Sequence, residues 1–417
     1  MENKSYLRNL PKVINLGCRL NFFESEIIKD ILDSKKINNT IVVNTCAVTN
    51  SAVSKSINEI KKASKKFPNS KIIVTGCASQ IDKTVFSNLP NVSKIVDNKV
   101  KTESNSYISN KKDKIGKYKF PNFNNLVSAR TRATLQIQQG CDHRCTFCVI
   151  PFGRGDAVSL PITEVNKRLK NIISLGYKEV TFTGVDLTSY GNDIPGKPNL
   201  GNLLKRVLID NPELKRLRLS SIDPAEIDDE LMDLMCYEKR LLPHFHFSIQ
   251  SGDNLILKRM KRRHNRHDVI RLCQKIKKKR KEVTFGADLI VGFPTENEAH
   301  FNNTLELVKI CSLSNVHIFP YSPKENTPAS KMPQVDENRK KERVSKLRSI
   351  SKEVLQKLMQ EKNGRKINVL FESTNLSYTD DFFKVKIKNN TNKKLNKGEI
   401  IEVKILNNNE NYLKAIV

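Results

Sequence analysis

The stretch Gly140-Cys141-Asp142-His143-Arg144-Cys145-Thr146-Phe147-Cys148 carries three cysteines in the spacing CxxxCxxC, directly after a predicted strand, Ala133–Gln138. Three thiolates at this spacing can bind three irons of a cubane 4Fe–4S cluster, which leaves the fourth iron open to another molecule. The alternatives are a zinc site, which would normally need a fourth cysteine or histidine, and three unrelated buried cysteines. His143 lies inside the loop and is a poor fourth ligand, so the spacing favours the cluster.

The segment after this loop repeats a strand-then-helix pattern. With the strand before the loop, it gives six predicted strands separated by helix-length segments: Ala133–Gln138, Lys178–Thr183, Lys215–Ser220, His244–Gln250, Val283–Val291 and Asn315–Pro320. This pattern predicts an α/β region built as a partial (β/α)6 barrel of parallel strands. By analogy with complete barrels, its active site should open at the carboxyl ends of the strands.

The segment before the loop also repeats one unit, in which an apolar strand precedes a small-residue turn with a cysteine. Lys12–Leu16 precedes Cys18, Ile41–Asn44 precedes Cys46, and Lys71–Val74 precedes Cys77. Three such units predict an N-terminal doubly wound parallel sheet, in which the three cysteines meet at one edge. The alternative is that each cysteine is a small buried hydrophobe at a strand end.

The last part of the chain changes character. The segment Asp336–Glu361 predicts one long helix with an apolar face, and Gly364 is a plausible stop. Four alternating segments then predict a C-terminal small β-barrel: Ile367–Glu372, Phe382–Lys388, Glu399–Leu406 and Tyr412–Val417. The polar stretch from Thr102 to Asn125 reads as a linker. The expected divisions are 1–105, a linker at 106–130, 131–356 and 357–417.

Charge and cysteine content point to a partner and a compartment. The 417 residues include 73 Lys plus Arg against 44 Asp plus Glu, a net charge of +29, which favours a polyanionic partner over a merely basic proteome. Leu257–Lys281 alone holds thirteen Lys or Arg and one acid, Asp268. No run of 18 uncharged apolar residues occurs, so we expect a cytoplasmic protein without a membrane span. Nine cysteines in a reducing compartment favour metal or redox chemistry over disulfides.

Not every cysteine or histidine belongs to these patterns. Cys236, Cys273 and Cys311 lie in predicted helices, where packing in the core is the preferred interpretation. His244 and His246 flank Phe245 on one strand and point to the same side, so they could contact a cofactor or substrate. The favoured interpretation is that both histidines form their hydrogen bonds within the barrel.

The cysteine loop, with aromatic Phe147 before its last cysteine, resembles the radical S-adenosylmethionine superfamily. The resemblance implies that S-adenosylmethionine chelates the open iron of the cluster on Cys141, Cys145 and Cys148. One electron then cleaves the sulfonium and gives a 5′-deoxyadenosyl radical. The superfamily binds this cofactor at strand ends, so the candidate contacts are the strand-end residues of this chain: Gly184, Asp186, Ser220, Gln250, Asp288 and Gly292.

The whole chain is also similar to one branch of that superfamily, the methylthiotransferases. Three motifs carry this likeness: Leu16-Gly17-Cys18-Arg19-Leu20-Asn21, Asn44-Thr45-Cys46-Ala47-Val48-Thr49 and Thr75-Gly76-Cys77-Ala78. The likeness implies a second 4Fe–4S cluster on Cys18, Cys46 and Cys77, whose attached sulfur is methylated and delivered to the substrate radical. It also implies two S-adenosylmethionine molecules, a C-terminal RNA-binding barrel of the TRAM type, and a tRNA anticodon loop as partner. We also expect an electron donor such as flavodoxin or ferredoxin, and we expect the chain to be a monomer.

Two tRNA branches are separated by the stretch after the second barrel strand. One acts on isopentenyladenosine and carries Gly-Gln-Asn-Val-Asn there, whereas this chain has Gly184-Val185-Asp186-Leu187-Thr188-Ser189-Tyr190-Gly191. That stretch resembles the branch that methylthiolates C2 of N6-threonylcarbamoyladenosine at position 37. One departure is that the branch carries arginine before the serine, whereas this chain has Val158-Ser159-Leu160. The alternatives are the isopentenyladenosine branch and a non-catalytic iron–sulfur RNA-binding protein; the basic charge argues against the branch that modifies a ribosomal protein.

Overall fold

The computed structural model describes residues 12–109, 115–121, 131–390 and 394–417. The chain forms two compact units, each assembled from separate segments. Unit 1 comprises residues 1–127, 138–158 and 322–327, and unit 2 comprises residues 128–137, 159–321 and 328–417. The cysteine loop therefore belongs to unit 1, and the six-strand region belongs to unit 2.

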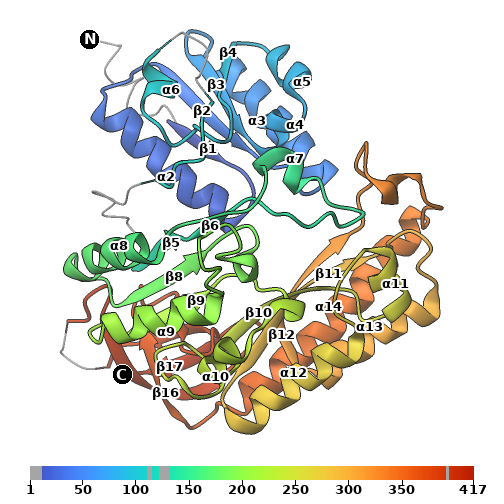
Figure 1. Ribbon diagram of the computed structural model, residues 1–417. Helices are drawn as coiled ribbons and strands as arrows, with labels where there is room; N and C mark the ends of the chain where they lie inside the picture. The colour runs from blue at the N-terminus through green and yellow to red at the C-terminus, as the bar shows by residue number, and fades with distance from the viewer. Residues whose placement is uncertain (1–11, 110–114, 122–130, 391–393) are drawn as a thin grey trace. The chain divides into compact units, whose positions relative to one another are not determined.

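The core of unit 1 is a parallel sheet in the order β1 (Val13–Asn15), β2 (Thr40–Thr45), β3 (Lys71–Gly76) and β4 (Val92–Ile95). All six residues of β2 are buried, as expected for a parallel strand that is covered on both faces. Helix α3 (Asn50–Lys66) packs Ile60 against the sheet, and α2 (Arg19–Ser34) lies on the other face (Figure 1).

The helices of unit 1 begin where the strands end. Cys18 caps α2 by accepting a hydrogen bond from the Asn21 N–H through its sulfur, and the Thr49 hydroxyl caps α3. The polar groups at these helix starts therefore gather along the carboxyl edge of the sheet. The remaining elements of unit 1 are short: α4 (Cys77–Ile81), α5 (Lys83–Ser87), α6 (Asn105–Ile108), β6 (Gln138–Gln139) and α7 (Ile150–Arg154).

Unit 2 contains six parallel strands that follow one another in chain order. They form two three-stranded sheets: β5 (Arg132–Gln136), β8 (Glu179–Thr183) and β9 (Arg216–Leu219), then β10 (His244–Gln250), β11 (Thr284–Val291) and β12 (Leu313–Pro320). Ile222 joins the sheets, because its N–H donates to the His246 carbonyl and its carbonyl accepts from the Ser248 N–H. The strands and their helices thus form the expected partial barrel.

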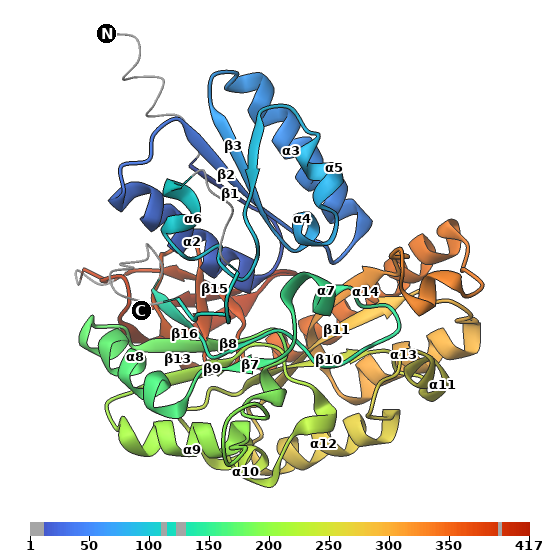
Figure 2. The same ribbon diagram turned by 45° about the horizontal axis from the view of Figure 1, so that its top comes forward.

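Helices cover the outer side of these strands (Figure 2). They are α8 (Ile162–Ser174), α9 (Leu200–Asp210), α10 (Asp229–Tyr237), α11 (Asn254–Arg259), α12 (Arg266–Lys279) and α13 (Glu298–Ile310). The short connections include β7 (Val158–Ser159) and three 3-10 turns, Leu187–Ser189, Pro224–Glu226 and Pro328–Lys331.

The end of unit 2 is a helix followed by a closed barrel. Helix α14 (Glu337–Gln360) ends before Gly364 and contributes Leu358 and Met359 to the barrel core. The barrel strands are β13 (Lys366–Leu370), β14 (Ser377–Thr379), β15 (Lys384–Lys388), β16 (Ile400–Asn408) and β17 (Leu413–Ile416). In β15 the lysines are exposed and the valine and isoleucine are buried, which is the alternation the sequence predicts.

The predicted α/β fold class is confirmed, with the parallel sheets and the C-terminal five-stranded barrel in place. The three domain limits stay a prediction. Much of the expected linker at 106–130 falls on residues 110–114 and 122–130, which lie outside the described residues. Among the described residues, no helix is long and apolar enough to cross a membrane.

Candidate active site

The three N-terminal cysteines gather at the carboxyl edge of the unit 1 sheet. Cys18 precedes α2, Cys46 follows β2, and Cys77 begins α4. The turn at Gly17 has a φ of +112°, and a side chain there would reach within 3.0 Å of the Cys46 sulfur. Burial raises the pKa of Cys46 to about 11, and the neighbouring Cys77 and Cys18 thiolates add to this rise. The sequence argument that a sheet edge would bring these cysteines together is therefore supported.

Buried charges surround this cysteine group. The Arg154 Nε donates to the Cys77 sulfur over 3.2 Å, and both terminal nitrogens of Arg154 pair with Glu24. Lys101 pairs at 2.6 Å with Oε2 of Glu24, the oxygen that also accepts from Nη2 of Arg154. Burial opposes the charge on Arg154, but Cys77 and Glu24 outweigh it and hold the pKa of Arg154 above its usual value. Three thiolates beside a fixed cation fit an iron–sulfur cluster, because thiolates and hydrogen bonds to sulfur are what such clusters need.

The CxxxCxxC loop, also in unit 1, is held by backbone bonds. The Cys141 N–H donates to the Gly155 carbonyl over 3.1 Å, and the Cys148 N–H donates to the Cys145 carbonyl over 3.1 Å. The Cys148 sulfur accepts from the Ile150 N–H at 3.4 Å. All three cysteines are half-buried, so their thiolates can reach a bound group at the surface of this unit. The donor set again fits a cubane cluster, with an open iron for a further ligand.

The predicted cofactor residues lie at strand ends of unit 2. Gly184 and Asp186 follow β8, Ser220 follows β9, Gln250 ends β10, and Gly292 follows β11. Gln250 has a φ of +75°, a costly conformation for a residue with a side chain, and such strain is typical of functional sites. The Ser220 hydroxyl is buried with no hydrogen-bond partner among the described residues. An orphaned hydroxyl at this edge fits a ligand that carries its own polar groups.

Asp288 differs from this set, because it lies within β11 rather than at its end. Its carboxylate accepts hydrogen bonds from His246 at 3.1 Å and from His317 at 3.0 Å. Burial opposes the charge on Asp288, but the two histidines lower its pKa well below the usual value. His246 and Asp288 are both among the residues that the sequence pattern indicates, whereas His317 is not, although it lies in a predicted strand. His244 is satisfied by Thr284 and stacks on Phe382.

Several basic side chains of the stretch Leu257–Lys281 form ion pairs within unit 2, so they do not all face an external partner as the sequence indicates. Arg262 pairs with Asp223 at 2.7 Å, and Arg266 pairs with Glu306 at 3.1 Å. Part of this charge therefore holds the fold of unit 2 together. In the last turn of α12, Lys277 donates to the Val283 carbonyl, and the Lys279 ammonium lies 5.9 Å from the centroid of the Tyr237 ring.

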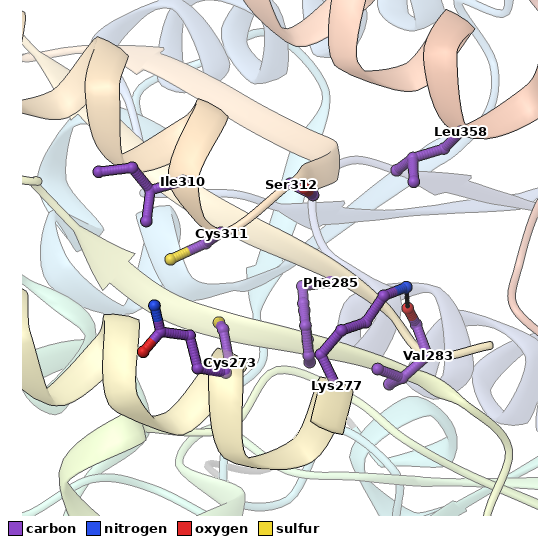
Figure 3. Close-up of a pocket in the computed structure, with 9 residues that line it drawn as sticks. Cys273, Lys277, Val283, Phe285, Ile310, Cys311, Ser312 and Leu358 are labelled. Atoms are coloured by element: carbon purple, nitrogen blue, oxygen red, sulfur yellow. Dashed lines mark hydrogen bonds between the residues drawn. The ribbon is translucent and has the colours of Figure 1, made fainter. Parts of the chain in front are cut away.

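Cys273 and Cys311 line a small cavity between α12, α13 and α14 (Figure 3). The Cys273 thiol forms a hydrogen bond with Cys311, and this bond together with burial raises the pKa of Cys273. Both cysteines are buried, and so is Cys236, as expected for core packing.

At the point of departure from the branch pattern, Leu160 is a buried side chain whose carbonyl accepts a hydrogen bond from the Tyr190 hydroxyl at 2.6 Å. Its neighbour Ser159 donates its backbone N–H to Asp193 at 3.0 Å. The segment is thus fixed by apolar packing and backbone bonds rather than by an arginine.

Comparison with known proteins places these features in context. The family model described as the Radical SAM superfamily matches residues 135–308, and the Uncharacterized protein family UPF0004 matches residues 12–97. The chain is 45% identical to the threonylcarbamoyladenosine tRNA methylthiotransferase MtaB of Rickettsia prowazekii (strain Madrid E), with 100% of each chain covered. It is 31% identical to the tRNA-2-methylthio-N(6)-dimethylallyladenosine synthase of Erythrobacter litoralis (strain HTCC2594), with 81% of each covered.

Among solved structures, a radical S-adenosylmethionine methyltransferase, TsrM, from Kitasatospora setae is similar in fold. Its TM-score is 0.52 at 12% identity, over 75% of this chain and 68% of that chain. At this identity the likeness concerns the fold alone.

Proposed function

Because this chain belongs to the radical S-adenosylmethionine methylthiotransferase family, we propose that it converts N6-threonylcarbamoyladenosine at position 37 of tRNA to its 2-methylthio derivative. The observation that carries this proposal is the 45% identity to a threonylcarbamoyladenosine tRNA methylthiotransferase over the full length of both chains. The relative named for the dimethylallyladenosine reaction is less similar and is matched over a shorter part of the chain.

Six cysteines are the proposed cluster ligands. Cys141, Cys145 and Cys148 would hold one 4Fe–4S cluster, and Cys18, Cys46 and Cys77 would hold a second. When bound, the first cluster with S-adenosylmethionine supplies the 5′-deoxyadenosyl radical, and the second carries the sulfur that becomes the methylthio group. One S-adenosylmethionine is the radical source and another is the methyl donor. The thiolates fix both groups in place, and Arg154 compensates charge beside Cys77.

Strand-end residues of unit 2 are the proposed contacts to S-adenosylmethionine. The Ser220 hydroxyl can hydrogen-bond a polar group of the cofactor, because nothing in the described part of the chain satisfies it. Gly184 allows close approach of the backbone, and Asp186 can accept from a cationic amine. At Gly292 the space that a side chain would need is filled by the side chain of Lys340. Asp288 is already bonded to two histidines, so we assign it to orienting His246 and His317.

The C-terminal barrel is the proposed RNA-binding module. Exposed lysines alternate with buried residues along β15, and Lys386 is in register with Lys414 of β17. Rows of lysine on a small barrel suit a phosphate backbone, which binds largely through charge. The proposed divisions are residues 1–105, 131–356 and 357–417, with a monomeric chain and an electron donor of the flavodoxin or ferredoxin class.

The test is mass spectrometry of tRNA nucleosides from a strain that lacks this protein. The strain is complemented with the wild-type chain or with Cys145→Ala. We expect the methylthio mark on threonylcarbamoyladenosine to disappear in the deletion strain and to return only with the wild type. A change confined to the isopentenyl derivative would mean that the substrate is isopentenyladenosine in tRNA instead. If neither nucleoside changes, and the intact reduced protein forms no 5′-deoxyadenosine, the proposed enzymatic function is wrong. The alternative, a non-catalytic RNA-binding protein, then takes its place.

A further inference from the structure

Arg154 lies at the centre of a buried polar network in unit 1. Its side chain is 2% exposed, and its three guanidinium nitrogens all have partners. Nε donates to the Cys77 sulfur at 3.2 Å. Nη1 donates to Glu24 at 2.9 Å and to Gln139 at 3.0 Å, and Nη2 donates to Glu24 at 3.0 Å and to Asn21 at 2.6 Å. The fork of the guanidinium is therefore fixed in one orientation by four residues from three parts of the chain.

The charges of this network do not cancel. Glu24 is fully buried and is paired with two cations, Arg154 and Lys101. One carboxylate is paired with two cations, so the network carries an excess of positive charge beside Cys77, to whose sulfur Arg154 donates. A buried charge is stable only when an opposite charge or hydrogen bonds compensate it. Because the single carboxylate of Glu24 does not balance the cations of this network, the cysteine thiolates are part of the charge balance.

Helix α7, which ends at Arg154, links the two cysteine groups. Helix α7 begins at Ile150, whose N–H donates to the Cys148 sulfur, and the helix ends at Arg154. The Gly153 carbonyl accepts from Asn98 at 2.6 Å, and Asn98 also approaches the Cys77 sulfur at 3.7 Å. A side chain on Gly153 would lie 3.3 Å from the Cys77 Cβ, so this helix rests directly on Cys77.

We propose that Arg154 is a positioning residue that sets the reduction potential of the cluster bound by Cys18, Cys46 and Cys77, by donating a fixed, charged hydrogen bond to the Cys77 thiolate. This inference rests on the proposed function, which assigns a cluster to those cysteines. Hydrogen bonds to ligand sulfur, net charge and burial are the protein's means of adjusting the potential of an iron–sulfur cluster.

The electron balance gives the direction of the effect. Reduction adds one electron to the cluster, and no bond to Arg154 forms or breaks. The reduced state carries one more negative charge, so a nearby cation stabilises it more than the oxidised state. Removing the cation therefore lowers the potential. Removing the Glu24 carboxylate, which opposes the electron, raises the potential.

The test isolates this cluster in the full-length chain. Cys141, Cys145 and Cys148 are replaced by alanine, and the protein is reconstituted without oxygen from iron and sulfide. Iron content and a redox titration followed by electron paramagnetic resonance are compared for the parent and for Arg154→Gln, Arg154→Lys and Glu24→Gln. Lys62→Gln is the matched control, because it removes an exposed cation of unit 1 whose side chain is 73% accessible.

We expect Arg154→Gln to reduce the ratio of reduced to oxidised cluster at least tenfold at a fixed potential, which corresponds to about 59 mV for a one-electron couple. Arg154→Lys should recover part of the shift, since lysine keeps the charge but not the fork. Glu24→Gln should shift the potential in the opposite direction, a result that a purely structural role does not predict.

An unchanged potential in Arg154→Gln with full iron content would overturn the inference. Loss of iron in Arg154→Gln but not in Arg154→Lys, with the unfolding temperature of the metal-free chain unchanged, would support a positioning role. Loss of iron in both, together with a lower unfolding temperature, would reduce Arg154 to a structural residue. If the parent itself binds no iron, the second cluster of the proposed function is absent, which is a separate failure.

Discussion

Arg218 Nε lies 2.7 Å from Oε1 of Glu179 on the neighbouring strand, in the interior of unit 2. Glu179 also accepts from Arg216 at 2.7 Å, so one buried carboxylate holds two buried guanidinium groups. Arg218 continues to the C-terminal barrel, where it donates to the Thr379 carbonyl at 3.0 Å and its guanidinium lies 5.0 Å from the Phe382 ring centroid. This carboxylate therefore fixes the arginines on which the barrel rests.

Glu179→Gln should destabilise the protein strongly, because it removes the carboxylate shared by two buried cations, and, among the described residues, only Arg216 keeps another carboxylate partner, Asp380. Removing one member of a buried ion pair costs about 3–5 kcal/mol. The measurement is the free energy of unfolding in denaturant. Glu213→Gln, an exposed change in the same unit, should leave that free energy within about 0.5 kcal/mol of the wild type. Equal effects of the two substitutions would mean that Glu179 is not a structural anchor.

The stability conferred by Glu179 should depend on pH in a defined range. Burial opposes its charge, but Arg218, Arg216 and Arg132 outweigh burial and lower the pKa of Glu179 from 4.5 to about 2. The folded-state pKa lies below the unfolded value, so the stabilisation is present above pH 4.5 and is lost as the pH falls toward 2. The difference in unfolding free energy between the wild type and Glu179→Gln should shrink across that range. A difference that stays constant would contradict the assignment.

Gly140→Ala should abolish the cluster at the CxxxCxxC loop. Gly140 has a φ of +73°, and a Cβ there would lie 1.9 Å from the Asp156 carbonyl oxygen, so the loop must move. We expect loss of about half of the bound iron and no formation of 5′-deoxyadenosine. Gly116→Ala is the control, because nothing lies within 4 Å of its Cβ position. Normal iron content in Gly140→Ala would show that the loop tolerates this change.

Ser220→Ala should weaken binding of S-adenosylmethionine while leaving the fold intact. The buried hydroxyl has no hydrogen-bond partner in the described part of the chain. Its removal therefore breaks no hydrogen bond of the fold described here and takes away only a desolvated polar group. Loss of one hydrogen bond to the cofactor, about 0.5–1.5 kcal/mol, corresponds to an increase in Kd of roughly 2- to 13-fold. Calorimetric titration without oxygen measures this change, with Ser174→Ala on α8 as the surface control. An unchanged Kd would remove Ser220 from the cofactor site.

The lysine row of the C-terminal barrel should govern the salt dependence of tRNA binding. Lys386→Gln and Lys414→Gln each remove one exposed cation of this row. Each substitution should weaken binding equally for all tRNAs and reduce the slope of log affinity against log salt by about 1. Lys205→Gln on α9, far from the row in sequence, should leave the slope unchanged. A loss restricted to particular tRNAs would indicate base recognition instead.

Apolar runs predicted most of the fold, whereas long-range charge pairing could not be predicted. The strand His244–Gln250 begins and ends where the sequence indicates, because β-branched and aromatic residues alternate along it. The strands Val92–Ile95 and Ser377–Thr379 were missed, since they are short and lack such a pattern. The three N-terminal cysteines could be placed together because parallel strand ends share an edge.

The partners of Arg154 carried no such signal. Glu24 and Lys101 look like ordinary solvent-facing charges in the sequence, and Glu24 is 130 positions away from Arg154. Only packing shows that these side chains are buried together. His317 was missed for a similar reason, because its pairing with Asp288 depends on the register of two strands.

The discontinuous composition of unit 1 has a consequence for how the protein is made. Residues 322–327 belong to this unit, and within it Ser322 accepts a hydrogen bond from the Asn50 N–H at the start of α3 while Asn50 donates its side-chain amide to Pro323. During translation, the N-terminal sheet leaves the ribosome long before this closing segment has been synthesised. The start of α3 therefore lacks these two hydrogen-bond partners on the nascent chain until more than three quarters of the protein has been synthesised.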